Sequence, residues 1–314
     1  MASQRESESK LEYYRKSYVY AEANYEYISS AFSYDGEVFV SSCGDNKYRV
    51  HTVSTPKTPT LIDSPILGTG KVAFTHNHNT IVSSFNTRGL LNSFGLFDLY
   101  TKEFVRLFHG HTDEITSLEH SISADIVLTA SADGHVMVWD IRTNNANVAN
   151  TVFQTIPVAN FNADGSGIVV VEGQNLEAFD LRKFPYNPIQ FLQLQNSYYP
   201  KLKCSLDGKR VAVSAVSGSV SIIDAFFEGK PVINTFETRQ KDGAPEIEFS
   251  PEGSRMLYSN GFDGSVNVYN FTTNLTSPLS QSNQTTVQSI KCNLRYPLFA
   301  TSCSVVNWWT VPLM

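Results

Sequence analysis

The 314-residue sequence lacks most of the features that mark secreted, membrane-spanning or nucleic-acid-binding proteins. Its four cysteines are widely scattered and include no CxxC pair, so neither a disulfide framework nor a zinc knuckle is expected. No stretch approaches the roughly 18 apolar residues of a membrane span, and no direct membrane contact is expected. The mild formal net charge of −6 argues against direct binding of nucleic acid.

The N-terminus also lacks the apolar core of a secretory signal, because residues 1–12 are rich in Ser, Glu, Lys and Gln. We expect these residues to form a disordered tail. Scattered, reduced cysteines fit the cytosol or the nucleus. Apolar residues make up 41% of the chain, enough for a sizeable core in residues 13–314. This length would allow two domains, but closed all-β folds often use about 200 residues or more as one unit.

Phe104 to Thr143 is the most informative stretch of the sequence. Two apolar runs, Phe104–Phe108 and Val136–Trp139, flank two strand-like runs, Ile115–His120 and Ile126–Ser131. Short apolar runs that are separated by polar turns are typical of strands. The stretch therefore predicts one unit of four short strands.

A Gly-His pair, Gly110-His111, follows the first run, and a Trp-Asp pair, Trp139-Asp140, ends the fourth. With a turn aspartate between them, Asp133, these pairs are the signature of one blade of a WD-repeat propeller. The pattern recurs at intervals of 47, 42, 40, 44, 46 and 39 residues, close to the ~40–45 residue blade period. The residues expected at the Trp139 position of the seven units are Val50, Phe97, Trp139, Phe179, Ile223, Tyr269 and Trp308.

Seven such units fill the chain almost without remainder, and no alternation of strands with long amphipathic helices is evident in the pattern. The sequence therefore predicts an all-β fold, a single seven-bladed WD-repeat β-propeller over residues 13–314. Tyr13–Tyr20 is aromatic and apolar enough for a strand but has no strand partner before it. We expect this N-terminal strand to pair with the last blade and close the ring.

The WD-repeat resemblance implies a role for His111, Ser131, Asp133 and Trp139. In that family these positions form a buried hydrogen-bond chain, in which the indole N–H donates to the serine hydroxyl and the aspartate accepts from the histidine. We expect the four residues to be structural. A His/Asp/Ser catalytic triad is the alternative, but a triad need not recur with the repeat spacing.

Other motifs indicate no enzyme, cofactor or metal site. Gly68–Lys71 is followed by Val72 instead of the Ser or Thr of a phosphate-binding loop. His76 and His78 have no cysteine or third histidine adjacent, so we expect them to face solvent and not a metal. Aspartates that precede glycine recur at repeated places, and they are predicted turn residues instead of a general acid and base.

Partner binding is expected on one rim of the propeller. In the WD-repeat family this rim carries the loops between blades and the loops before each Trp-position strand. Tyr198 and Tyr199 are predicted to be exposed aromatics suited to peptide contacts. Arg88, Arg239 and Lys241 are predicted to hold a phosphate or carboxylate. A solvated rim with scattered charges is the alternative for any one of them. The predicted partner-binding residues are Lys71, Arg88, His135, Tyr198, Tyr199, Arg239 and Lys241.

Several segments go beyond the general repeat. Leu202–Phe226 carries DGK and IDAF, Tyr100–His111 reads YTKEFVRLFHGH, Phe179–Phe184 reads FDLRKF and Phe299–Trp309 reads FATSCSVVNWW. Together they resemble the WD-repeat subunit shared by COMPASS-type histone methyltransferases and by nuclear messenger-RNA 3′-end and termination phosphatase assemblies. The resemblance extends from about Tyr18 to Trp309. Leu206, where Ser or Asn is usual, and an expanded loop at Thr272–Thr286 depart from the pattern.

This resemblance implies a non-catalytic scaffold or adaptor in the nucleus that acts on RNA polymerase II transcription, through histone H3 lysine-4 methylation, messenger-RNA 3′-end processing and termination, or both. The implied partners are a peptide segment of a histone methyltransferase, or of a scaffold that carries protein phosphatase 1, and the phosphorylated tail of RNA polymerase II. Two alternatives stay open. One is a ubiquitin-ligase substrate receptor, and the other is an enzyme with acids or histidines clustered at the channel mouth, of which the sequence shows none.

Overall fold

Strands make up the regular structure of the described part of the chain. The computed structural model describes residues 14–21, 25–55, 58–87, 89–143, 146–195, 198–226, 231–240, 243–261, 264–279 and 285–310. Among these residues, no helix has the length and apolar character needed to span a membrane. The tail expected at residues 1–12 lies outside them and stays a prediction.

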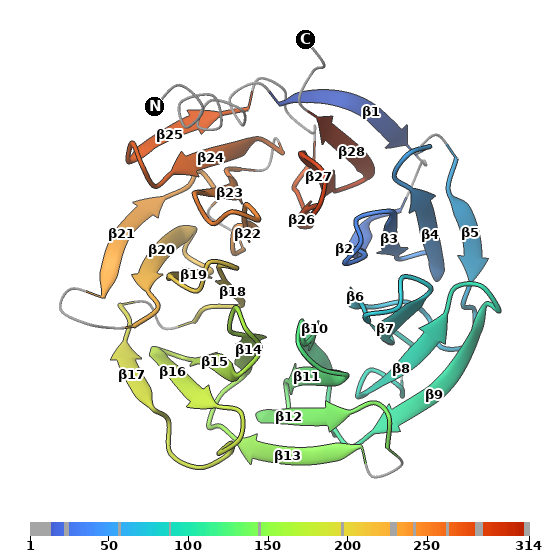
Figure 1. Cartoon of the computed structure of the whole chain (residues 1–314), viewed down its shortest axis with the longest axis horizontal. Helices are drawn as coiled ribbons and strands as arrows, with labels where there is room; N and C mark the ends of the chain where they lie inside the picture. Colours follow the sequence, from blue (N-terminus) through green and yellow to red (C-terminus); the bar gives the residue numbers. More distant parts are fainter. Residues whose placement is uncertain are drawn as a thin grey trace.

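The strands form seven four-stranded antiparallel sheets, arranged around a central axis like the blades of a propeller (Figure 1). Blade one holds β2 (Tyr27–Phe32), β3 (Val38–Cys43), β4 (Lys47–Thr52) and β5 (Thr60–Asp63), and blade two holds β6 (Val72–Phe74), β7 (Thr80–Ser84), β8 (Ser93–Asp98) and β9 (Glu103–His109). Blade three holds β10 (Ile115–His120), β11 (Ile126–Ser131), β12 (His135–Asp140) and β13 (Asn147–Val152). The predicted all-β, seven-bladed fold is confirmed.

The remaining blades repeat this order. Blade four holds β14 (Pro157–Phe161), β15 (Gly167–Glu172), β16 (Asn175–Asp180) and β17 (Gln190–Gln193), and blade five holds β18 (Lys201–Cys204), β19 (Arg210–Ser214), β20 (Ser219–Asp224) and β21 (Val232–Glu237). Blade six holds β22 (Ile247–Phe249), β23 (Arg255–Ser259), β24 (Val266–Asn270) and β25 (Leu275–Pro278). Blade seven combines β26 (Ser289–Cys292), β27 (Leu298–Ser302) and β28 (Val305–Thr310) with β1 (Arg15–Ala21).

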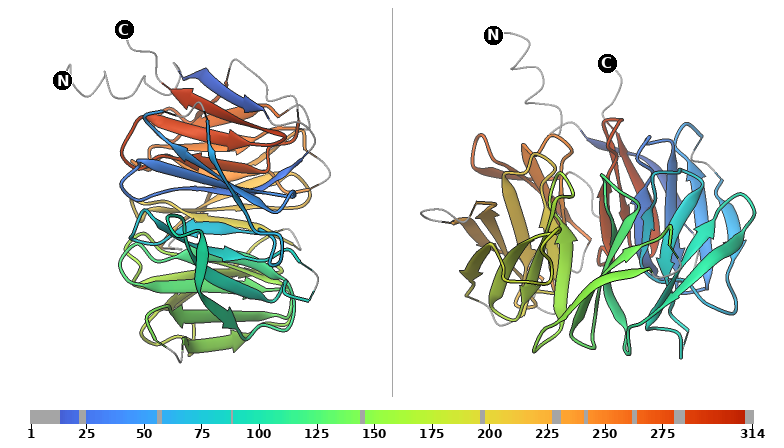
Figure 2. Two further views of the ribbon diagram at one scale, coloured as in Figure 1. Left: turned by 90° about the vertical axis from the view of Figure 1, so that its right-hand side faces the viewer. Right: turned by 60° about the horizontal axis from the view of Figure 1, so that its bottom comes forward.

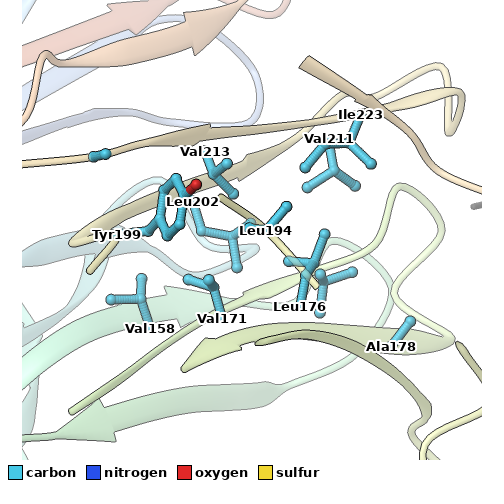
Figure 3. Packing of buried hydrophobic residues seen from close by; sticks show 12 residues of the cluster. Val158, Val171, Leu176, Ala178, Leu194, Tyr199, Leu202, Val211, Val213 and Ile223 are labelled. Atoms are coloured by element: carbon cyan, nitrogen blue, oxygen red, sulfur yellow. The ribbon is translucent and has the colours of Figure 1, made fainter. Parts of the chain in front are cut away.

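Burial follows the position of each strand within its blade. The second strands are almost wholly buried, as in β11 and β19, because neighbouring sheets pack on both of their faces. The fourth strands alternate between exposed and half-buried residues, as in β13, because one side of the strand meets solvent. Val171 and Leu176 of blade four lie in one cluster with Leu202 and Val213 of blade five, which Figure 3 shows.

The N-terminal strand closes the ring. β1 pairs antiparallel with β28, with Tyr18 opposite Trp308, so blade seven takes its outer strand from the start of the chain. Figure 1 shows β1 along the outer side of β28. Tyr14 packs against Phe299 with ring centroids 5.1 Å apart. The expected closure is confirmed, and it covers the edge that β28 would otherwise expose.

The ladder register corrects two of the residues expected at the Trp139 position. The ladder pairs equivalent to that of Trp139 place His51 at this position in blade one and Trp309 in blade seven. The predicted Val50 and Trp308 are therefore wrong by one residue. Because side chains alternate between the faces of a sheet, each of these residues points to the opposite face from the one expected.

Removing β1 is expected to destabilise the ring strongly. A variant without residues 1–21 loses Tyr14 and the inner sides of Tyr18 and Tyr20, which pack in the clusters on either side of blade seven. At roughly 1.5–3 kcal/mol for each large side chain that is fully buried, this loss costs on the order of 4 kcal/mol. A variant without residues 1–12 keeps these contacts and should unfold as the full chain does. Thermal unfolding followed by circular dichroism checks both, and equal melting temperatures for all three proteins contradict a closing role for β1.

Candidate functional site

Two rims and a central channel are the surfaces that the blades leave open. We call the rim with the links between blades, and with the turns between second and third strands, the upper rim. The lower rim carries the turns between first and second strands and between third and fourth strands. Figure 2 shows these loops at the two ends of the strands. The first strands of the blades line the channel, which contains a cavity of about 310 Å³.

Blade three holds the buried hydrogen-bond chain that the sequence predicts, but with a different hydroxyl. His111 Nδ1 lies 3.1 Å from Asp133 Oδ2, and His111 Nε2 lies 2.7 Å from the Thr129 hydroxyl. Trp139 Nε1 donates to the same hydroxyl over 2.7 Å. Ser131, predicted to accept from the indole, instead donates to a backbone carbonyl. Both hydroxyl residues share one face of β11, but Thr129 is nearer to Trp139 along the ladder and is the one within reach.

The directions of these bonds fix the protonation of the chain. The Asp133 carboxylate accepts from Nδ1 of His111, so Nε2 accepts from the threonine hydroxyl, whose oxygen accepts from the indole. Burial lowers the pKa of His111 despite the nearby carboxylate, in keeping with a neutral imidazole. Burial raises the pKa of Asp133, but the backbone amides of Thr112 and His135 and the His111 ring outweigh it and hold that pKa below its ordinary value.

The arrangement differs from a catalytic triad. The hydroxyl on His111 Nε2 belongs to Thr129, which is fully buried and bonded through both its proton and its oxygen. The four bonded side chains tie the link ahead of β10 to the middle strands of the blade. A Cβ on Gly110 would lie 2.8 Å from the Trp139 ring, which accounts for the glycine of the Gly-His pair.

Charged side chains in the first strands, or directly before one, form ion pairs in the channel. The pairs are Lys201 with Glu246, Lys203 with Glu119 at 2.6 Å and Lys291 with Glu248 at 3.5 Å. Lys203 of blade five thus reaches past blade four to blade three. Burial raises the pKa of Glu119, but the ammonium groups of Lys203 and Lys291 outweigh it and hold that pKa below its usual range. Glu119 therefore stays ionised inside the ring.

Lys71 is a channel lysine without an ion pair in the described part of the chain. It precedes β6 at the upper rim and lines the cavity. Burial and the nearby Lys201 ammonium lower the pKa of Lys71 to about 8. An ammonium group without a carboxylate partner suits a carboxylate or phosphate from another molecule. Lys71 therefore remains a candidate contact for an anionic group.

The two tyrosines of the predicted peptide contact differ in exposure. Tyr198 is 37% exposed and lies in the link between blades four and five, on the upper rim. Tyr199 is only 2% exposed, because its ring packs with Leu202 and Val213 in the cluster of Figure 3. The expectation that Tyr199 is an exposed aromatic is therefore wrong. Its burial adds to the contact between blades four and five and leaves Tyr198 alone on the surface.

The other predicted partner-binding residues are placed as follows. Arg239 is exposed in the link between blades five and six, also on the upper rim. His135 begins β12 there, is half-buried, and donates its backbone N–H to Asp133 over 2.8 Å. Arg88 and Lys241 lie outside the described residues, so their positions stay predictions. The described candidates thus share one rim without forming one compact cluster.

The lower rim brings together residues that the sequence spacing does not indicate. His76 is expected to have no third histidine beside it, but His120 lies close, with ring centroids 4.8 Å apart. Asp125 Oδ1 lies 3.2 Å from His76 Nδ1, and Tyr34 stacks on the His76 ring. These residues belong to the first turn of blades one, two and three. Their shared position, in the turn between the first and second strands of a blade, is the sequence signal that could have indicated that these residues meet.

Comparison with known proteins agrees with this architecture. Residues 102–140 match the family described as WD domain, G-beta repeat, and they span β9 of blade two and the first three strands of blade three. The chain therefore contains a WD40 repeat. The solved β-propeller domain of Cps50 (Swd1) from Myceliophteria thermophila covers 95% of this WD40-repeat protein, and all of that domain is covered in return. Its TM-score of 0.78 at 12% identity shows the shared fold.

Two relatives resemble the WD40-repeat protein over most of its length. WD repeat-containing protein 82 from Drosophila melanogaster is 27% identical over 286 residues, which is 88% of each chain. COMPASS component SWD2 from Saccharomyces cerevisiae is 23% identical over 300 residues, again 88% of each chain. These similarities confirm the predicted resemblance to a COMPASS-type WD-repeat subunit.

Thr129→Val is expected to destabilise the fold more than Ser131→Ala. The valine leaves His111 Nε2 and Trp139 Nε1 buried without a partner, at about 1–3 kcal/mol for each orphaned group. Ser131→Ala removes one bond to a backbone carbonyl, worth about 1 kcal/mol. Thr129→Ser keeps the hydroxyl and is the matched control. Urea denaturation measures all three losses, and a Ser131→Ala loss equal to that of Thr129→Val overturns the assignment.

Lys71 is expected to titrate near pH 8, below the ~10.4 of an ordinary lysine. Nuclear magnetic resonance of ¹³C-methylated lysines measures this, and Lys71→Met identifies the signal by its loss. Because the folded pKa lies below the unfolded one, the unfolded chain binds this proton more tightly. The wild-type free energy of unfolding, relative to Lys71→Met, should therefore rise between about pH 8 and about pH 10. A flat difference over that range contradicts the lowered pKa.

Proposed function

We propose that this WD40-repeat protein is a non-catalytic scaffold subunit of a COMPASS-type histone methyltransferase complex in the nucleus. The observation that carries the proposal is the similarity to COMPASS component SWD2 over 88% of both chains. A similarity of this length extends around the whole ring. It therefore supports a shared mode of assembly, beyond the shared repeat that a single blade would indicate.

A closed ring suits this role for an energetic reason. The blades bury both faces against their neighbours, so the binding surface is formed before the partner arrives. A partner segment that is disordered on its own then loses conformational freedom alone. We place that segment on the upper rim, where Tyr198 is exposed and Lys71 has no ion pair with any residue that the structure describes. An extended peptide with an apolar anchor and an acidic or phosphorylated residue matches these two side chains.

The proposal includes a second assembly of the same nuclear machinery. The sequence resemblance extends to messenger-RNA 3′-end and termination phosphatase assemblies, whose partner segment belongs to a scaffold that carries protein phosphatase 1. A phosphorylated tail of RNA polymerase II has the charge that the upper rim favours, because Lys71 and the exposed Arg239 both lie there. Both assemblies use the ring in the same way, as a rigid holder of an extended segment.

Affinity capture from a nuclear extract tests the proposal. The tagged full chain is expected to recover subunits of a histone methyltransferase complex, with phosphatase and 3′-end components as a second group. Tyr198→Ala is expected to lower this recovery roughly tenfold, because truncation of an interface aromatic commonly costs about 1.4 kcal/mol or more. Lys71→Met should lower it as well without lowering the melting temperature, since it removes a half-buried charge that has no ion pair among the described residues.

Tyr186→Ala is the matched control. Tyr186 is also a solvent-exposed tyrosine, 77% exposed against 37% for Tyr198, but it lies on the lower rim between β16 and β17. Its recovery of partners should equal that of the wild type. Equal losses from Tyr186→Ala and Tyr198→Ala would place the contact elsewhere. Recovery of only ubiquitin-ligase or cytoskeletal proteins would replace the proposed complex with an unrelated one.

A further inference from the structure

Side chains from neighbouring blades meet on the lower rim, beside the channel mouth. His76 lies in the β6–β7 turn of blade two, and His120 and Asp125 lie at the two ends of the β10–β11 turn of blade three. One ligand atom from each of the three lies within 4.8 Å of the other two. His76 Nδ1 and Asp125 Oδ1 are 3.2 Å apart, close to the ~3.3 Å between two ligands on a tetrahedral zinc ion with bonds of about 2.0 Å.

The second ring nitrogens of both histidines have contacts of the kind that orient metal ligands. His76 Nε2 lies 3.0 Å from the backbone carbonyl of Ile122, to which its N–H donates. The Tyr34 hydroxyl donates to the His120 carbonyl over 3.2 Å and lies 3.3 Å from His120 Nδ1, from which its oxygen accepts. A ligating histidine usually donates its second ring N–H to such a group. This tautomer leaves His76 Nδ1 and His120 Nε2 free to bind a cation.

His120 Nε2 is the unexplained polar atom of the group. His120 is only 7% exposed, and in the described part of the chain its Nε2 has no hydrogen-bond partner. Buried polar atoms are normally bonded, so an orphaned one calls for a ligand or another explanation. Because Nδ1 of His120 donates its N–H to the Tyr34 hydroxyl oxygen, Nε2 carries the lone pair of the neutral ring.

We propose that His76, His120 and Asp125 bind a zinc ion. Two imidazole nitrogens and one carboxylate oxygen are a ligand set that zinc accepts, with a fourth position for water. The side chains of His76 and Asp125 are 41% and 42% exposed, so that position faces solvent. The ion joins the turn of blade two to the turn of blade three and holds the two blades together at the lower rim. The site lies on the rim opposite Lys71 and Tyr198, so it is separate from the proposed partner surface.

Metal titration of the tag-free full chain tests this site. The protein is stripped with a chelator and titrated with Zn²⁺ by calorimetry, and with Co²⁺ by absorption spectroscopy to detect tetrahedral coordination. We expect one equivalent to bind, and Zn²⁺ to raise the melting temperature. His76→Ala and Asp125→Asn should each lower the affinity by more than about 100-fold, because each removes a ligand; Tyr34→Phe should lower it by roughly 10–100-fold, as expected for an outer contact.

His78→Ala is the matched control. His78 is the neighbouring imidazole on the same turn, but its Nδ1 pairs with Asp35 at 2.9 Å, and it is not part of the three-residue group. Its affinity for zinc should equal that of the wild type. Both ligand variants change exposed side chains, so they are expected to fold, and their unfolding curves without metal check this. The absence of saturable Zn²⁺ and Co²⁺ binding by the wild type, or unchanged binding by His76→Ala, overturns the proposal.

Discussion

Packing on both faces of every sheet is the constraint on which the rest of the molecule depends. A sheet that is covered on both sides can offer a ligand only its inner edge, its outer edge and the turns at its ends. The second and third strands therefore read as nearly continuous buried runs, as in β11 and β12. Polar side chains that can contact a ligand must therefore lie in the channel or on the rims. The charged channel residues and the lower-rim histidines lie there.

The same constraint explains how much of the fold the sequence could predict. Blade number and closure follow from turn residues and from the repeat interval, which depend on local chemistry. The exact register did not follow in blade seven, because Trp308 and Trp309 are adjacent, equally large and both buried. Alternation cannot choose between two such residues. Only the ladder, in which Trp309 lies opposite Phe299, decides which one takes the Trp139 position.

Side-chain partners were harder to predict than strands, for two physical reasons. Thr129 and Ser131 are hydroxyl residues two positions apart on one strand face, so sequence cannot say which one lies within reach of the indole. Tyr199 adjoins an exposed tyrosine in a link between blades, and its burial depends on a neighbouring blade. His76 meets His120 for the same reason, since adjacent blades bring together turns that are far apart in the chain. Such contacts exist only once the ring has formed.

The pairing of β1 with β28 has a consequence for synthesis on the ribosome. The strand that completes blade seven emerges early, and the strand it must pair with emerges last. Six blades can form in order as their strands leave the ribosome. Until β28 is synthesised, the backbone hydrogen-bonding groups of β1 have no strand partner. During that interval an alternating, half-apolar strand is open to pairing with other chains. Slow translation of the last blade would lengthen the time for which β1 stays unpaired. It would therefore increase the chance that β1 pairs with another chain before β28 is available.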